Sequence, residues 1–269
     1  MGRNERGEVD RVPEESDIEI PLLGGNVSES VVRVGDTVRK PVTASTPAVE
    51  ALLKHLAEAG FDAAPKTLGR DERGRQVLEF IPGTMADAYG RPPLTMPELR
   101  RVGRLIRELH DATVSFVPPA DATWNVAIPS DTTDLICHRD LAPWNLVLAD
   151  DGRWVFIDWD GAGPGSRLWD LAYAAHGFVA LHAAGDPAAD APRLRAFADG
   201  YGLDERQRRA FPELIVGHTR GMYDLLRRGF ETGEQPWARL YAEGHGDHWG
   251  PAADYIEAHL ETWRRALLG

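Results

Sequence analysis

The segment His138-Arg139-Asp140-Leu141-Ala142-Pro143-Trp144-Asn145 constrains the fold of this chain more than any other part of its sequence. Two short apolar runs follow it, and the turn sequence Asp150-Asp151-Gly152 joins them, which predicts a hairpin. The second run ends at Asp158. The hairpin therefore brings the carboxylate of Asp158 back beside the loop that carries Asp140.

This arrangement suits the transfer of a phosphoryl group. The segment matches the H-R-D-x-x-x-x-N catalytic loop of kinases. Mg²⁺ prefers hard oxygen ligands, and a carboxylate can orient the attacking hydroxyl and accept its proton. We interpret Asp140 as the catalytic base and Asn145 and Asp158 as metal ligands. His138 is expected to support the loop, and Asp160 is a weaker candidate for metal or substrate.

Three stretches resemble the aminoglycoside phosphotransferase family, relatives of the protein kinases: Cys137–Asp140 with Asn145, Phe156–Asp160, and Trp169–Ala172. Many members have His-Gly-Asp where this chain has His-Arg-Asp, but the Asp and the Asn are retained. The resemblance implies a two-lobed, protein-kinase-like α+β fold with a small antiparallel-sheet N-lobe and a mainly helical C-lobe. It also implies a supporting role for Asp170, which would brace the catalytic loop.

The order of predicted elements agrees with two lobes. We expect a mobile tail over residues 1–17, a nucleotide-binding N-lobe over 18–83 and a catalytic, substrate-binding C-lobe over 84–269. Strands are expected at 18–23, 30–34, 37–42, 75–81, 135–137, 146–148 and 154–157. Helices are expected at 46–60, with Thr46 as N-cap, and at 96–110, 168–184, 211–230 and 252–268, with a surface loop over 183–192.

The nucleotide end carries weaker signals, because the chain has no G-x-G-x-x-G and no Walker A sequence. Ser28 and Ser30 lie where a phosphate-covering hairpin is expected. Lys40, at the end of a strand, best matches the lysine that pairs with the α- and β-phosphates. Glu50 is its candidate ion-pair partner, although Lys54 offers Glu50 an ordinary helix-surface pair instead.

Glu79-Phe80-Ile81 resembles the hinge between the lobes of kinases. The backbone from Glu79 to Ile81 would there contact adenine. The resemblance implies ATP as the donor, with GTP as an alternative, and Mg²⁺ as the metal.

Charge and composition exclude several partners. The net charge is −12, from 30 Lys and Arg against 42 Asp and Glu, which argues against a nucleic acid and suits a cationic ligand. No apolar run approaches the length of a membrane span. The single cysteine excludes an intramolecular disulfide, and the charged N-terminus does not match a signal peptide, so we expect a cytoplasmic protein.

The acceptor pocket is expected in the helical lobe, where acidic and aromatic residues interleave. These residues are Asp224, Glu231, Glu234, Glu243, Asp247, Asp254, Glu257 and Glu261, with Tyr223, Trp237, Tyr241, Trp249 and Trp263. Solvated helix faces and core aromatics are the alternative interpretation. Glu243–His248 also has closely spaced metal-ligand residue types, but it lacks cysteine and a second half-site.

We therefore expect an ATP- and Mg²⁺-dependent O-phosphotransferase acting on a hydroxyl of a small cationic molecule such as an aminoglycoside antibiotic. A metabolic kinase for an amino alcohol or sugar, such as choline, homoserine or a glycated amine, is one alternative. A non-catalytic resistance protein that sequesters its ligand is another. A protein kinase is disfavoured, because the short link between Asp160 and Asp170 leaves no room for an activation segment.

Overall fold

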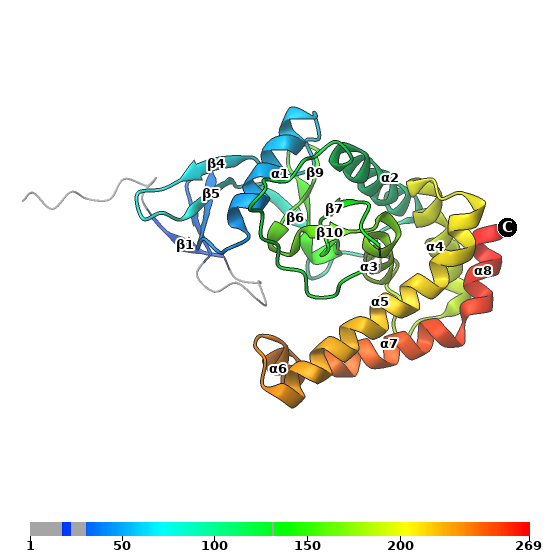
Figure 1. Cartoon of the computed structure of the whole chain (residues 1–269). Coiled ribbons are helices and arrows are strands. Elements are labelled where there is room, and N and C mark those ends of the chain that lie inside the picture. The colour runs from blue at the N-terminus through cyan, green and yellow to red at the C-terminus, as the bar shows by residue number, and fades with distance from the viewer. Residues whose placement is uncertain (1–17, 23–30, 131) are drawn as a thin grey trace, which may run out of the picture.

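The computed structural model describes residues 18–22, 31–130 and 132–269. In these residues an antiparallel sheet comes first, followed by two smaller sheets and a mainly helical C-terminal part. Figure 1 shows the first sheet at one end of the molecule and the C-terminal helices at the other. The mixed α+β organisation expected from the sequence is confirmed. The tail expected over residues 1–17 lies outside the described residues.

The first sheet has the strand order β1-β2-β3-β5-β4, and all neighbouring strands are antiparallel. Its strands are β1 (Ile20–Pro21), β2 (Val32–Val34), β3 (Thr37–Lys40), β4 (Thr67–Arg70) and β5 (Gln76–Glu79). As expected, the two-residue turn Gly35-Asp36 joins β2 and β3, with Gly35 at φ 56°. The sequence did not predict β4, because its side chains are exposed or half-buried and show no apolar alternation.

Helix α1 (Thr46–Glu58) packs one apolar face into the core through Val49, Leu52, Leu53 and Leu56. The expected N-cap was wrong by one residue. Ser45 occupies the cap position, and the Thr46 hydroxyl instead accepts a hydrogen bond from the Thr43 N–H at 2.8 Å.

Two small sheets carry the segments with the sequence motifs. One has the order β6-β8-β9, with β6 (Gly83–Met85), β8 (Leu146–Ala149) and β9 (Trp154–Phe156). In the other, β7 (Leu135–Cys137) pairs with β10 (Gly163–Gly165). The predicted hairpin between β8 and β9 is confirmed. Because β6 and β10 are three residues long and contain glycine, they show no period that could have predicted them. A lobe boundary near residue 83 stays a prediction.

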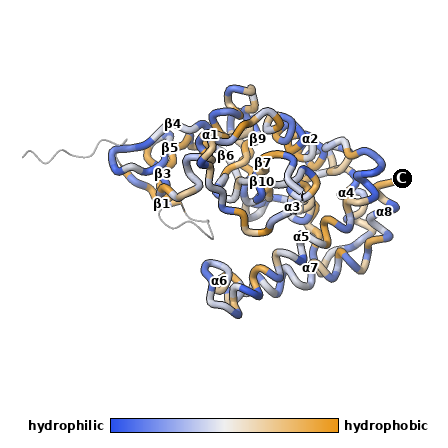
Figure 2. The backbone as a smooth tube through the Cα atoms, in the orientation of Figure 1, coloured by the Kyte–Doolittle hydropathy of each residue, from blue (hydrophilic) through white to orange (hydrophobic). Residues whose placement is uncertain are grey.

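The rest of the described chain is mainly helical. Its helices are α2 (Met96–Thr113), α3 (Arg167–Val179), α4 (Pro187–Tyr201), α5 (Glu205–Thr232), α6 (Trp237–Leu240), α7 (Gly246–Ala258) and α8 (Leu260–Leu268). In Figure 2 hydrophilic and hydrophobic residues alternate along α5 and α7, which pack against each other. None of the described helices has the length and hydrophobicity that crossing a membrane requires.

Several limits expected in the helical part were wrong: α4 was not predicted as a helix, and α5 begins at Glu205 rather than at 211. The surface loop expected over 183–192 ends early, because Asp186 caps α4 by accepting a hydrogen bond from the Ala188 N–H at 3.0 Å. Helix α3 stops at Val179, where Ala180 turns into the left-handed region at φ 65°. The helix expected over 252–268 is two helices, since His259 leaves helical geometry between α7 and α8.

Candidate active site

The loop from His138 to Asn145 connects β7 to β8 and ends in a 3₁₀ turn, η2 (Pro143–Asn145). The imidazole of His138 is fully buried. Its Nδ1 accepts the Asp140 N–H at 3.3 Å, so the ring proton lies on Nε2, which faces the Ile157 carbonyl at 3.1 Å. Burial lowers the pKa of His138, which keeps the ring neutral. The two ring nitrogens of His138 thus hydrogen-bond the loop that carries Asp140 and the end of the β8–β9 hairpin.

Both carboxylate oxygens of Asp140 accept a hydrogen bond from a side chain. The Tyr173 hydroxyl donates to Oδ1 at 2.6 Å, and Asn145 Nδ2 donates to Oδ2 at 2.8 Å. Burial raises the pKa of Asp140, and the bond from Tyr173 opposes that rise. Asn145 Nδ2 also contacts the Asp140 carbonyl at 2.9 Å, which leaves the amide oxygen of Asn145 for another ligand.

Asp158 and Asp160 both approach Lys40, which belongs to the first sheet. Asp158 adopts a left-handed backbone at φ 60° and precedes the 3₁₀ turn η3 (Trp159–Gly161). The Nζ atom of Lys40, on β3, lies 2.6 Å from Oδ2 of Asp160 and 3.7 Å from Oδ1 of Asp158. The structure thus gathers the candidate lysine and both carboxylates into one cluster.

The expected pairing of Lys40 with Glu50 is not found. Oε2 of Glu50 instead lies 3.0 Å from the Arg70 guanidinium, and the buried Oε1 has no hydrogen-bond partner among the described residues. Arg70 belongs to β4, the strand that the sequence did not predict. The packing of β4 near α1 therefore supplied a closer cation than Lys40.

Asp170 braces the loop from the start of α3. Its Oδ1 accepts the Arg139 N–H at 2.8 Å, and His110 Nε2 donates to Oδ2 at 3.0 Å. Arg139 itself has a left-handed backbone at φ 69°. Burial acts to raise the pKa of Asp170, but the hydrogen bond from His110 and the charge of Arg139 outweigh it and the pKa is lowered.

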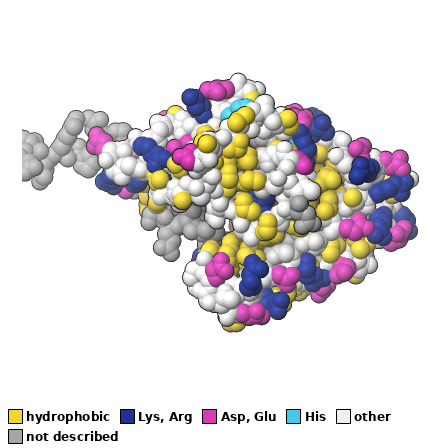
Figure 3. All heavy atoms as spheres, viewed as in Figure 1, with side chains coloured by type: hydrophobic (Ala, Val, Ile, Leu, Met, Phe, Trp, Pro, Cys, Tyr) yellow, Lys and Arg dark blue, Asp and Glu magenta, His cyan; other side chains and the backbone are white. Residues whose placement is uncertain are grey.

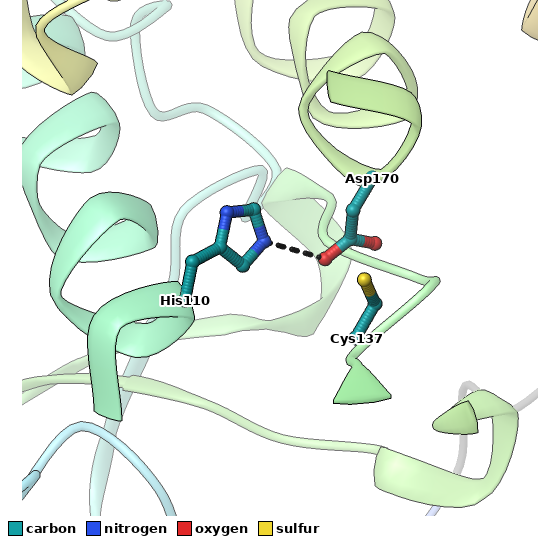
Figure 4. Close-up of side chains that lie close together, drawn as sticks. All are labelled: His110, Cys137 and Asp170. Carbon is teal, nitrogen blue, oxygen red and sulfur yellow. Dashed lines mark hydrogen bonds and ion pairs between the residues drawn. The ribbon is translucent and has the colours of Figure 1, made fainter. Parts of the chain in front are cut away.

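Figure 4 shows the side chains of His110, Cys137 and Asp170 together. Their potential ligand atoms lie within 4.8 Å of one another, and this is the only such triad within the described part of the chain. However, both Asp170 oxygens already accept hydrogen bonds, and burial raises the pKa of the Cys137 thiol, which keeps it protonated. The triad therefore supports the loop and offers no ligand atom to a metal ion. The alternative metal site at 243–248 forms no triad in the described chain, and Glu243 pairs with Arg239 at 3.0 Å.

The other residues predicted to bind the nucleotide are the two serines and the hinge residues. Ser28 and Ser30 lie outside the described residues. The N–H groups of Glu79 and Phe80 donate to the carbonyls of Lys66 and Asp36, at 2.9 and 3.0 Å. The Ile81 N–H donates no hydrogen bond within the described part of the chain, so Ile81 stays the hinge candidate.

A cavity of about 900 Å³ opens beside Asp140. The carboxylates of Asp158 and Asp160 also line it. Its other polar and aromatic lining includes Asp87, Asn125, Arg139, Trp144, Tyr173, His218, Glu234, Trp237, Glu243, His245, His248 and Trp249. Acidic side chains thus outnumber basic ones around this space.

Only some of the late acidic and aromatic residues reach that cavity. Glu234, Glu243, Trp237 and Trp249 line it. Trp263 is instead a core residue, fully buried. Trp144, Tyr173 and His218 are among the lining residues that the sequence did not indicate. A signal existed for Trp144, which lies inside the motif, and for Tyr173, one helical turn after Asp170.

A small antiparallel sheet joined to a helical part, with a carboxylate-bearing loop and hairpin between them, defines a kinase-like phosphotransferase. Comparison with known proteins agrees. The model of the phosphotransferase enzyme family (APH) matches residues 120–211. The trifolitoxin immunity protein of Rhizobium leguminosarum bv. trifolii is 32% identical over 231 residues, which cover 81% of this chain and 86% of that protein.

Solved structures share the fold at low sequence identity. A choline/ethanolamine kinase family protein from Mesorhizobium loti superposes with a TM-score of 0.59 and 17% identity, covering 94% of this chain and 93% of that one. A microcompartment-associated aminopropanol kinase gives a TM-score of 0.61 and 13% identity, covering 94% of each chain. The chain belongs to the phosphotransferase enzyme family.

Proposed function

We propose that this enzyme transfers the γ-phosphoryl group of ATP, with GTP as an alternative donor, to a hydroxyl of a small cationic molecule. The observation that carries the proposal is the position of Asp140, which is anchored by two hydrogen bonds and lines a cavity of about 900 Å³. A space of that size suits a small molecule. The acidic lining favours a cation, and the aromatic rings offer it faces to contact.

Each loop residue has a part in the proposal. Asp140 orients the acceptor hydroxyl and takes its proton, because it is the carboxylate that the cavity and the loop share. His138 and Asp170 support it through the loop backbone, as their contacts with the Asp140 and Arg139 N–H groups indicate.

The donor end rests on the cluster around Lys40. Asp158 and Asp160 converge on its ammonium group, so this pair of carboxylates already accommodates a cation. Asp158 and the amide oxygen of Asn145 are hard ligands that fit Mg²⁺. When bound, Mg²⁺ neutralises charge on the phosphate oxygens of the nucleotide. Lys40 would pair with phosphate oxygens, and the Ile81 N–H would contact the base.

The test is a coupled assay of ADP release from Mg-ATP, with mass spectrometry of each acceptor. The panel holds aminoglycosides, choline, ethanolamine, aminopropanol, homoserine, simple sugars, amicoumacin and trifolitoxin; several of these are named with similar proteins. We expect one compound to gain about 80 Da, the mass of one phosphoryl group. Asp140→Asn should lower its turnover by about 10²- to 10⁴-fold while nucleotide binding is retained.

Asp190→Asn is the matched control, because Asp190 is also buried and also accepts a tyrosine hydroxyl, from Tyr255 at 2.7 Å, outside the site. It should retain turnover. A chain that binds no nucleotide in any metal condition would contradict the proposal. Equal losses in both variants would remove Asp140 from its role.

Sequestration is the second candidate function, and one observation favours it. The relative at 32% identity is named for immunity to a toxin, and immunity needs only that the toxin is kept from its target. Binding of trifolitoxin or an antibiotic in calorimetry, without ADP release and equally in Asp140→Asn, would favour sequestration over transfer.

A further inference from the structure

Tyr173 lies between the acceptor cavity and the candidate base. It belongs to α3, it is 7% exposed, and it lines the cavity of about 900 Å³. Its hydroxyl donates to Oδ1 of Asp140 at 2.6 Å, a short bond of the kind that a phenol makes to a carboxylate. No motif used above assigns a role to this residue.

Helix α3 holds two consecutive residues of the loop. Asp170 accepts the backbone N–H of Arg139, and Tyr173 donates to the side chain of Asp140. Positions three residues apart share one face of a helix. One face of α3 therefore fixes the backbone at Arg139 and the carboxylate at Asp140 together.

Three rings from other parts of the chain hold the phenol in place. Trp249 of α7 stacks on it at 6.0 Å between centroids and 12° between planes. His218 of α5 lies 5.1 Å away, and Trp144 of η2 meets it edge-on at 6.5 Å and 85°. These rings fix the position of the phenol, and its hydroxyl meets Oδ1 of Asp140 as its acceptor. Burial and the charge of Asp140 raise the pKa of Tyr173 well above its ordinary value, so the hydroxyl keeps its proton.

We propose that Tyr173 is a positioning residue for phosphoryl transfer, and that its hydroxyl holds the Asp140 carboxylate in the orientation that receives the acceptor hydroxyl. The proposal rests on the function proposed above. A carboxylate held by one donor can rotate about its terminal bond, whereas donors on both oxygens fix its plane. Asn145 supplies one donor and Tyr173 the other. The remaining lone pairs of Asp140 are then directed by the protein before any acceptor binds.

The first test is Tyr173→Phe, which removes the hydroxyl and keeps the ring that packs on Trp249. With an acceptor from the panel, kcat should fall about 10- to 100-fold, the range for losing a hydrogen bond to a charged group. KM for the nucleotide should stay unchanged. Tyr255→Phe is the matched control, because it removes a tyrosine–carboxylate bond of similar length between α7 and α4, away from the cavity. Its kcat should equal that of the wild type.

A second measurement needs no acceptor, so it separates failure of this proposal from failure of the proposed function. A short O–H···O⁻ bond gives a proton resonance far downfield in NMR spectra of the full chain. One such resonance should vanish in Tyr173→Phe and shift in Asp140→Asn, and it should persist in Tyr255→Phe. An unchanged kcat in Tyr173→Phe would overturn the proposal. So would a resonance that Tyr173→Phe leaves in place, or equal losses of kcat in the two tyrosine variants.

Discussion

The Nζ atom of Lys40 lies 2.6 Å from Oδ2 of Asp160, across 120 positions of the chain. Lys40 ends a strand of the first sheet, and Asp160 lies in the turn after β9. Lys40 is only 8% exposed, so water screens this ion pair less than a surface pair. The contact ties the first sheet to the hairpin that carries the candidate metal ligand Asp158.

Lys40→Met should weaken nucleotide binding by about tenfold or more, since the phosphates lose a desolvated cation. It should also lower the free energy of unfolding by about 1–3 kcal/mol, because two carboxylates lose their shared partner. Nucleotide titration calorimetry and urea unfolding measure the two effects. Lys54→Met is the control, because its pair with Glu58 spans 3.9 Å on an exposed helix surface. Equal nucleotide affinity in both variants would contradict the role of Lys40.

Asp158→Asn should raise the Mg²⁺ concentration needed for half-maximal turnover by more than about tenfold. Even the loss of a residue that only hydrogen-bonds a metal ligand commonly lowers metal affinity about 10- to 100-fold. The measurement is ADP release against Mg²⁺ at fixed nucleotide. Asp151→Asn, in the turn between β8 and β9, should leave the requirement unchanged. A chelator should abolish turnover, and added Mg²⁺ should restore it. Turnover that resists the chelator would remove the metal from the proposed mechanism.

Asp170→Asn should destabilise the fold by about 2–3 kcal/mol, because an amide offers one acceptor oxygen where the carboxylate serves both the Arg139 N–H and His110. Turnover should fall as well, since the loop backbone loses its brace. Chemical denaturation should show a lower midpoint with the slope unchanged. Asp134→Asn, at an exposed position, is the comparison. A variant as stable as the wild type would exclude the bracing contact.

Acid should destabilise the protein through two buried histidines. Burial lowers the pKa of His176 and of His218 from 6.5 to about 3. In the unfolded chain these two histidines therefore become protonated near pH 6.5, whereas in the folded chain they stay neutral down to about pH 3. Stability is fully present above pH 6.5 and declines below it, by about 1.4 kcal/mol per pH unit for each histidine.

His176→Phe should remove one of these slopes from urea unfolding measured between pH 6.5 and 4. Both ring nitrogens of His176 lack hydrogen-bond partners among the residues that the structure describes, and the ring stacks on Trp249 at 4.3 Å between centroids, so Phe keeps the packing. Combining it with His218→Phe should remove both slopes. If the pH dependence of the double variant matches that of the wild type, these histidines are not the cause.

On the face drawn in Figure 3, Lys and Arg are interspersed with Asp and Glu over the helical part. That face carries no single-sign stripe of the kind that binds a nucleic-acid backbone.

The loop over His138–Asn145, the hairpin that ends at Asp158 and the start of α3 could be predicted from the sequence, because local structure governs them. Each of these segments has clear strand, turn or capping signals. The position of Lys40 at the end of a strand could also be read from the sequence, and its neighbour Arg39 points to the opposite face of that strand. The sequence could also predict that the C-terminal part is helical, since its apolar residues recur at helical spacing.

Tertiary packing alone decided the contacts between distant segments. Glu50 pairs with Arg70 rather than Lys40 because β4, a strand with no apolar pattern, brings the guanidinium closer. Among the late tryptophans, Trp249 lines the cavity and Trp263 is in the core, which periodicity could not separate because both lie on buried helix faces. The bond from Tyr173 to Asp140 depends on how α3 packs on the loop. Local propensity acts over a few residues, whereas these choices depend on side-chain packing between elements that meet only in the folded chain.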